Sequence, residues 1–234
     1  MSASFRKGLR DGIPIGLGYL SVAFAFGIQA MAVGLSPLQA LLISMTNVTS
    51  AGQLAGITLI GAGASLFEMG LTQLTINLRY ALMSLSLSQR MGEDMGTLQR
   101  MIFSFCNTDE IFAVASSQEG KLGKSYLYGL MIFPWFGWAL GTYIGSIAGT
   151  LLPMFVRTAL GIAIYGMFIA IIIPPAKTQK PVRVVVLLAA CISLLLHYVP
   201  LLSRIPAGYA IILCAVIAST VGAILFPEKE DDVS

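Results

Sequence analysis

The chain has 234 residues, of which 56% are hydrophobic and only 11% are charged, and its formal net charge is +3. Its mean hydropathy is +0.84, whereas soluble domains carry roughly 25% charged residues, so these values exclude a soluble domain and indicate an integral membrane protein. Three cysteines without paired spacing and a single histidine support neither a disulfide framework nor a zinc site. We expect no metal, no cofactor and no nucleic-acid partner.

Apolar runs follow one another along the whole chain. Seven have about the length that crosses a bilayer, at residues 13–33, 38–60, 66–88, 126–149, 156–173, 182–199 and 207–226. An eighth run, 98–118, is interrupted by polar residues at 107–110. This pattern predicts an all-α, polytopic membrane helix bundle of seven to eight hydrophobic segments, one or two of them broken, in a single transporter domain spanning residues 1–234.

The run 38–60 is interrupted in its middle by small and polar residues. Backbone groups released by a helix break find no partners in hydrocarbon, so the break must face protein or a water-filled cavity. In transporters, such half-helix ends at mid-depth bind small polar solutes. We therefore predict that this break binds substrate through Asn47, Thr49, Ser50, Gly52 and Gln53. The alternative is a kink packed by small residues, with Gly52 and Gly56 in a close helix contact.

Arg79 lies about midway along the run 66–88. An arginine at that depth is costly and usually points into a helix bundle or a water-filled cavity. Because a guanidinium can hold a carboxylate through two hydrogen bonds, we predict that Arg79 binds the carboxylate of a substrate, together with Asn77. The alternative is a structural ion pair with Asp109 or Glu110.

Asp109 and Glu110 are adjacent carboxylates inside the otherwise apolar run 98–118. Proton-coupled transporters use ionisable groups in such a setting to load and release protons. We therefore predict a role in proton coupling for these two residues. The alternative is an ordinary helix N-terminus, with Asn107 or Thr108 as its cap.

Lysine and arginine in short loops predict which side of the membrane each loop occupies. Three groups should be cytoplasmic, namely Arg6, Lys7 and Arg10, then Lys121 and Lys124, then Lys177, Lys180 and Arg183. The chain must then cross an even number of times between the first two groups. Either 98–118 also crosses, which makes eight spans, or 38–60 is a re-entrant hairpin, which makes six. We favour eight, because the 23 residues of 38–60 reach about 34 Å as a helix.

Two further features of the run 126–149 concern packing. Gly141, Gly145 and Gly149 repeat every four residues, which predicts a close contact with another helix. Trp135 and Trp138 are interpreted either as interfacial aromatic residues or as part of a cavity wall.

Several short motifs occur in a characteristic order. They are Leu17-Gly18-Tyr19, Ser50-Ala51-Gly52-Gln53, Asn77-Leu78-Arg79, Thr108-Asp109-Glu110, and Trp138 followed by Gly141-Thr142. In this order and spacing, the chain resembles the AzlC-type permeases, the large subunit of branched-chain amino acid exporters. One departure is Tyr80, where the family commonly has histidine after the Asn-Leu-Arg motif. The change removes one candidate proton carrier and directs attention to Asp109 and Glu110.

The resemblance implies a secondary transporter that exports hydrophobic amino acids such as leucine, isoleucine, valine or methionine. It also implies a small, separately encoded AzlD-type membrane subunit as partner, besides membrane lipid. The expected location is the bacterial plasma (inner) membrane, with both termini cytoplasmic. No nucleotide-binding Gly-x-x-x-x-Gly-Lys-Ser/Thr motif is present, so we expect no ATP drive within the chain, and no enzyme activity. The alternatives are a passive channel or pore, or an accessory membrane subunit.

Overall fold

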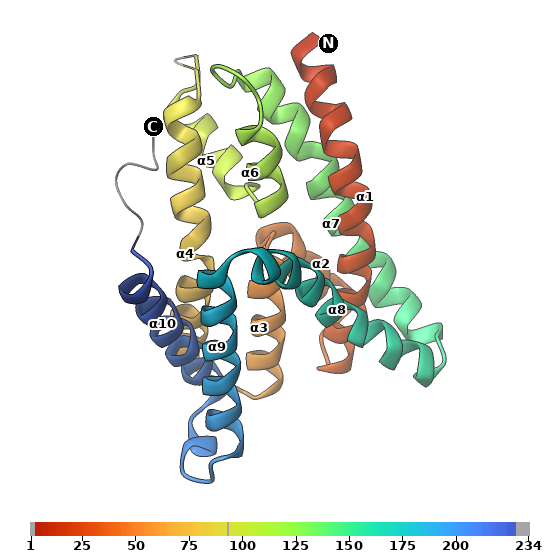
Figure 1. The fold of residues 1–234 in the computed structure, drawn as a ribbon. Coiled ribbons are helices and arrows are strands. Elements are labelled where there is room, and N and C mark those ends of the chain that lie inside the picture. The colour runs from red at the N-terminus through yellow and green to blue at the C-terminus, as the bar shows by residue number, and fades with distance from the viewer. Residues whose placement is uncertain (1–2, 93, 228–234) are drawn as a thin grey trace. The chain divides into compact units, whose positions relative to one another are not determined.

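The computed structural model describes residues 3–92 and 94–227, and within them every regular element is a helix (Figure 1). The elements are α1 (Ala3–Ala32), α2 (Pro37–Thr46), α3 (Ser50–Gly61), α4 (Leu66–Arg90), α5 (Thr97–Phe105), α6 (Asp109–Ser116), α7 (Lys124–Leu151), α8 (Met154–Thr178), α9 (Lys180–Tyr198), the 3₁₀ turn η1 (Leu202–Arg204) and α10 (Ala207–Leu225). The predicted all-α fold is confirmed. Glu93 and the charged C-terminal residues 228–232, and with them the predicted cytoplasmic C-terminus, lie outside the described residues.

Each apolar run of the sequence corresponds to a helix, and the two interrupted runs are the broken ones. The run 38–60 is divided into α2 and α3, and the run 98–118 is divided into α5 and α6. Among the described residues, four helices are both long and apolar enough to cross a membrane, namely α1, α7, α9 and α10. The structure is thus that of a multi-pass membrane protein.

The chain folds as two compact units. Unit 1 comprises Met1–Ile57 and Asn77–Ile164, and unit 2 comprises Thr58–Ile76 and Tyr165–Ser234. The assignment of one transporter domain to the whole chain stays a prediction.

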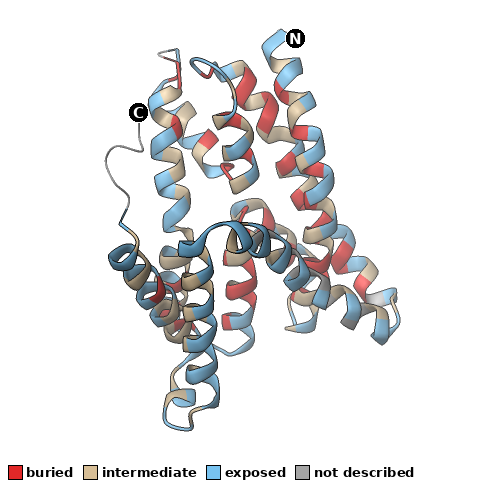
Figure 2. Ribbon diagram, viewed as in Figure 1, coloured by how far each residue is buried: buried red, intermediate tan, exposed pale blue. Residues whose placement is uncertain are grey.

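In unit 1, α1 and α7 are in backbone contact along a seam lined by glycine. A Cβ on Gly8 would lie 2.1 Å from the carbonyl oxygen of Tyr126, and one on Gly145 would lie 2.1 Å from that of Phe24. Since the contacts advance in the same direction on both helices, α1 and α7 run parallel. Buried residues follow this seam in Figure 2. The predicted close contact is confirmed, and Lys7 and Lys124 lie at the same end of the unit.

The helices α5 and α6 form a hairpin that does not cross. The Arg90 guanidinium, at the end of α4, donates to the carbonyl of Ser116 at 2.7 Å and to that of Gln118. The Gly92 N–H donates to the Leu122 carbonyl at 3.0 Å. The chain therefore leaves α4 and returns to α7 at one end, whereas a crossing would separate these groups by about 30 Å. The expectation that the run 98–118 crosses the membrane, which gave eight spans, is therefore wrong.

The helices α2 and α3 also form a hairpin. The Gln53 amide Nε2 donates to Ser44 Oγ at 2.8 Å, although nine residues of continuous helix would separate these positions by about 13 Å. In Figure 1, α2 and the start of α3 fold back on each other at the break. The re-entrant alternative is thus the arrangement found, because side chains on both sides of the break share one buried hydrogen-bond network.

Unit 2 contains a buried carboxylate, Glu68, in the first turn of α4. It is 5% exposed and accepts a hydrogen bond of 2.8 Å from the backbone N–H of Gly208. Gly208 lies in the first turn of α10, where the helix dipole favours a negative charge. Cys214 joins α10 to α9 through a bond of 3.3 Å to the carbonyl of Ala189. These contacts tie the start of α4 to the α9 and α10 helices.

Candidate functional site

The two helix breaks of unit 1 lie at one level, near the middle of α1 and α7. Tyr19 of α1 lies at this level, and its hydroxyl is 2.5 Å from Thr108 Oγ1 in the second break. The Tyr19 ring packs edge to face on Trp138, with centroids 5.1 Å apart. Trp138 Nε1 in turn donates to Gln53 Oε1, just after the first break, at 2.9 Å. The tips of the two hairpins are therefore connected through a tyrosine and a tryptophan.

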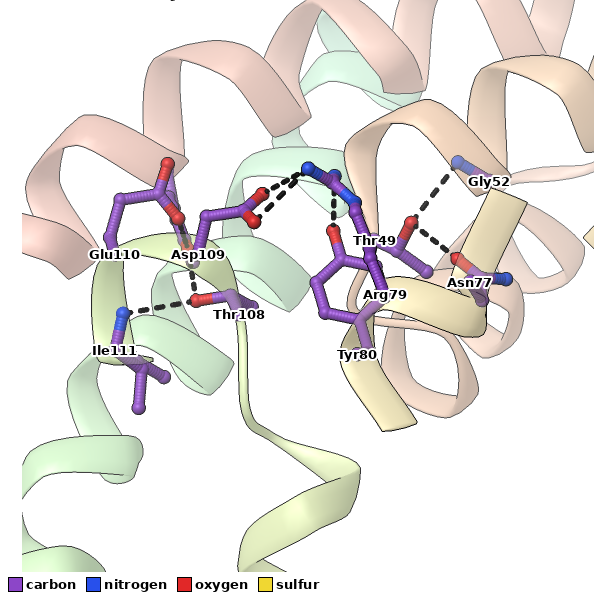
Figure 3. A network of polar contacts seen from close by, with 10 residues as sticks. Thr49, Gly52, Asn77, Arg79, Tyr80, Thr108, Asp109, Glu110 and Ile111 are labelled. Atoms are coloured by element: carbon purple, nitrogen blue, oxygen red, sulfur yellow. Dashed lines mark hydrogen bonds and ion pairs between the residues drawn. The ribbon is translucent and has the colours of Figure 1, made fainter. Parts of the chain in front are cut away.

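The first break brings two of its predicted residues, Thr49 and Gly52, together with the predicted Asn77 of α4. Thr49 Oγ1 accepts from the Gly52 N–H at 3.1 Å and donates to Asn77 Oδ1 at 3.0 Å (Figure 3). Asn47 ends α2, where its own N–H donates to the Ile43 carbonyl at 2.8 Å. Ser50 is the first residue of α3. Thus Thr49 caps α3 and joins this tip to α4.

Gln53 is used for packing in this structure. It is 1% exposed, and both ends of its amide are bonded, the nitrogen to Ser44 and the oxygen to Trp138. Ser44 Oγ is also 2.6 Å from Thr142 Oγ1 on α7. This buried network holds the first hairpin against α7. A direct contact of Gln53 with substrate stays a prediction.

Arg79 forms an ion pair with Asp109, as the alternative interpretation of its charge proposed. Its Nη1 lies 2.9 Å from Asp109 Oδ2 and donates to Oδ1 at 3.0 Å. Its Nη2 donates to the Tyr80 hydroxyl at 2.8 Å. The side chains of Arg79 and Asp109 are 47% and 45% exposed, so the pair is accessible rather than sealed in the core.

The two adjacent carboxylates have different partners. Asp109 binds Arg79 (Figure 3), whereas Glu110 accepts a hydrogen bond from the Tyr19 hydroxyl. Thr108 is the N-cap of α6, since its Oγ1 accepts from the Ile111 N–H at 3.3 Å. The predicted cap is confirmed, and both carboxylates lie in a first helical turn, which the helix dipole stabilises.

Several contributors to this region were missed by sequence reasoning. Tyr19 was part of a motif but carried no assigned role, and an aromatic residue in an apolar run gives no signal of a polar contact. Tyr80 was noted only for the histidine it replaces. Trp138 is 3% exposed in the core of unit 1, and Trp135 Nε1 donates to the Met45 carbonyl at 3.3 Å. The interfacial interpretation is therefore wrong for Trp138, and for the half-buried Trp135 it stays a prediction.

Comparison with known proteins was consistent with these motifs. The model of the AzlC protein family matches residues 14–152, more than half of the chain. The inner membrane protein YgaZ of Escherichia coli strain K12 is 29% identical over 199 residues, which cover 82% of this chain and 81% of that protein. An uncharacterized membrane protein of Archaeoglobus fulgidus is 33% identical over 178 residues, covering 75% and 78%. A third, from Helicobacter pylori strain 26695, is 29% identical over 153 residues, covering 62% and 66%.

No solved structure matches the chain. The family match includes both hairpins and α7, and it therefore contains all the polar contacts of the two breaks. The chain belongs to the AzlC family of membrane proteins.

Proposed function

We propose that the protein is a secondary transporter that exports branched-chain and other hydrophobic amino acids, such as leucine, isoleucine, valine and methionine. One observation supports this most. Two hairpin tips meet midway along the long helices of unit 1, and an accessible Arg79–Asp109 ion pair lies at the second of them. Interrupted helices that present backbone ends and charged groups at mid-depth are the common design of substrate sites in secondary transporters.

Each group near the breaks has a proposed task. The end of α2 at Asn47 and the start of α3 at Thr49, Ser50 and Gly52 offer backbone and hydroxyl groups to the polar end of the amino acid. Asn77 contributes its amide, and Arg79 binds the carboxylate. Gln53 orients the tip from within its buried network. No group is assigned a bond-breaking task, so we propose no enzymatic reaction.

Proton coupling is the proposed source of energy. Asp109 or Glu110 would load and release the proton, since both are carboxylates in the first turn of α6. A passive pore would instead show flux that does not respond to a proton gradient. Efflux measured with and without an imposed gradient therefore separates the two mechanisms.

We also propose a small AzlD-type subunit as partner and a plasma-membrane location with both termini cytoplasmic. The shared end of α1 and α7 supports this orientation, because it places Lys7 and Lys124 on one side, as the positive-inside rule requires. In a chain without its natural cysteines, a cysteine in place of Glu119 should resist a membrane-impermeant label applied outside intact cells. Labelling of that cysteine would reverse the orientation.

Efflux of labelled leucine tests the function directly. Cells or vesicles would contain the chain alone, the chain with its partner, or the Arg79→Ala variant with the partner. We expect the Arg79→Ala variant to lose efflux by about 100-fold or more, because one arginine supplies the cation for the carboxylate. The exposed Arg6→Ala variant is the matched control and should transport normally. Unaltered efflux in Arg79→Ala would remove Arg79 from the site.

A further inference from the structure

The Asp109 carboxylate binds the Arg79 guanidinium in the way that the carboxylate of a ligand would. Both carboxylate oxygens lie within 3.0 Å of Arg79 Nη1. The other side of the guanidinium is held by Tyr80, whose hydroxyl accepts from Nη2 and whose ring centroid lies 4.7 Å from the guanidinium carbon. Arg79 is therefore fixed in place by its neighbour in α4, while its anion is supplied by another element.

The pair is open to exchange. Nearly half of each side chain is accessible, in contrast to the buried bonds of Gln53 and Thr142. Asp109 is the first residue after the second break, and Arg79 lies near the middle of the 25-residue helix α4. A small solute that reaches this level can contact both charges.

We propose that a zwitterionic α-amino acid replaces this internal ion pair by dividing it, with its carboxylate on Arg79 and its ammonium group on Asp109. The inference deepens the proposed transport function and rests on it. It also separates the tasks of the two carboxylates. Asp109 becomes part of the substrate site, and Glu110, which is held by Tyr19, remains for proton coupling.

Counting charges shows why the substrate must carry both groups. The empty site contains one cation and one anion, which neutralise each other. A zwitterion adds one of each, so every charge again has a partner. A solute with a carboxylate alone would leave Asp109 without a cation, and an amine alone would leave Arg79 without an anion. Unpaired charges are costly inside a membrane protein, so the site should reject both kinds of solute.

Competition with labelled leucine tests this selection on the purified full-length chain at pH 7. The competitors are unlabelled leucine, 4-methylpentanoate, which lacks the ammonium group, and 3-methylbutylamine, which lacks the carboxylate. We expect each one-charge analogue to bind at least about 100-fold more weakly than leucine, since a site built for a polar group strongly rejects the analogue without it. Binding of either analogue within about tenfold of leucine would overturn the inference.

Two variants assign the charges to residues. Asp109→Asn should reduce the preference for leucine over 4-methylpentanoate to less than about tenfold, while 3-methylbutylamine stays weak. Arg79→Gln should show the opposite pattern. Glu119→Gln, an exposed carboxylate outside the site, should keep both preferences. If folded Asp109→Asn keeps the full preference over 4-methylpentanoate, Asp109 does not hold the ammonium group and the inference fails.

Different results would contradict the divided ion pair and the transport function on which it rests. If the wild-type chain binds and exports leucine but accepts the analogues equally, only the divided ion pair is wrong. If leucine is neither bound nor exported, the transport function itself is wrong, and the inference falls with it. Because the wild-type competition needs no substitution, it decides the question even where a variant does not fold.

Discussion

The seam between α1 and α7 and the region of the two helix breaks belong to the same unit but are built in opposite ways. At the seam, Gly16 and Gly137 bring two backbones so close that a Cβ on Gly137 would lie 2.3 Å from the Gly16 carbonyl oxygen. At the breaks, side chains rather than backbones make the contacts, and an ion pair stays nearly half exposed. Gly16 precedes Tyr19 by only three positions on α1.

The comparison indicates that the seam and the hairpin tips have different roles, although both lie along one helix pair. A glycine-lined contact leaves no space for an added side chain, because the close packing of backbones provides its stability. The hairpin tips instead depend on a few hydrogen bonds through Tyr19 and Trp138. We therefore expect substitutions at the seam to act mainly on stability, and substitutions at the tips to act increasingly on transport.

Gly16→Ala should have the largest effect on stability. Its Cβ would lie 2.6 Å from the carbonyl oxygen of Phe133, so the helices must separate, at a cost of about 3 kcal/mol in the free energy of unfolding. Gly18→Ala is the matched control on the same helix, since no heavy atom lies within 4 Å of its Cβ. Denaturant unfolding of the purified protein compares the two. Equal stability would show that the seam is not tight.

Trp138→Phe should have the next largest effect. It removes the donor to Gln53 Oε1, an atom of a side chain that is only 1% exposed, and an unsatisfied buried acceptor costs about 2 kcal/mol. Trp135→Phe loses a longer bond of 3.3 Å in a partly buried place and should cost less. The same unfolding experiment ranks them. The reverse order would mean that the Gln53 network does not hold the first hairpin.

Tyr19→Phe should have the smallest effect on stability, about 1 kcal/mol, because the ring contact with Trp138 remains and Glu110 stays accessible to water. Its effect should appear in transport, as an altered response of leucine efflux to an imposed proton gradient. Tyr126→Phe is the control, since it loses a similar bond of 2.9 Å to Asp11. An unchanged response in Tyr19→Phe would remove Glu110 and its partner from proton coupling.

Much of the fold could be predicted from local sequence. Hydrophobic runs and their polar interruptions place both breaks to within a few residues of where the structure has them, at 47–49 and 106–108, because helix formation in a membrane depends on the residues of the segment itself. The loop charges reduced the topology to two arrangements. They could not choose between them, because the choice depended on Arg90 binding the carbonyls that follow α6, a contact between distant residues.

The sequence by itself determined which residues are polar in an apolar setting, and so identified Arg79, Asp109 and the first break as unusual. Only the tertiary structure decided their partners: Asp109 on Arg79, Glu110 on Tyr19, and Gln53 inside a buried network. The physical reason is distance. The cost of a polar group in a membrane is a property of the residue, whereas its compensation depends on what folding brings within 3 Å, here from 30 residues away for Asp109 and 91 for Glu110.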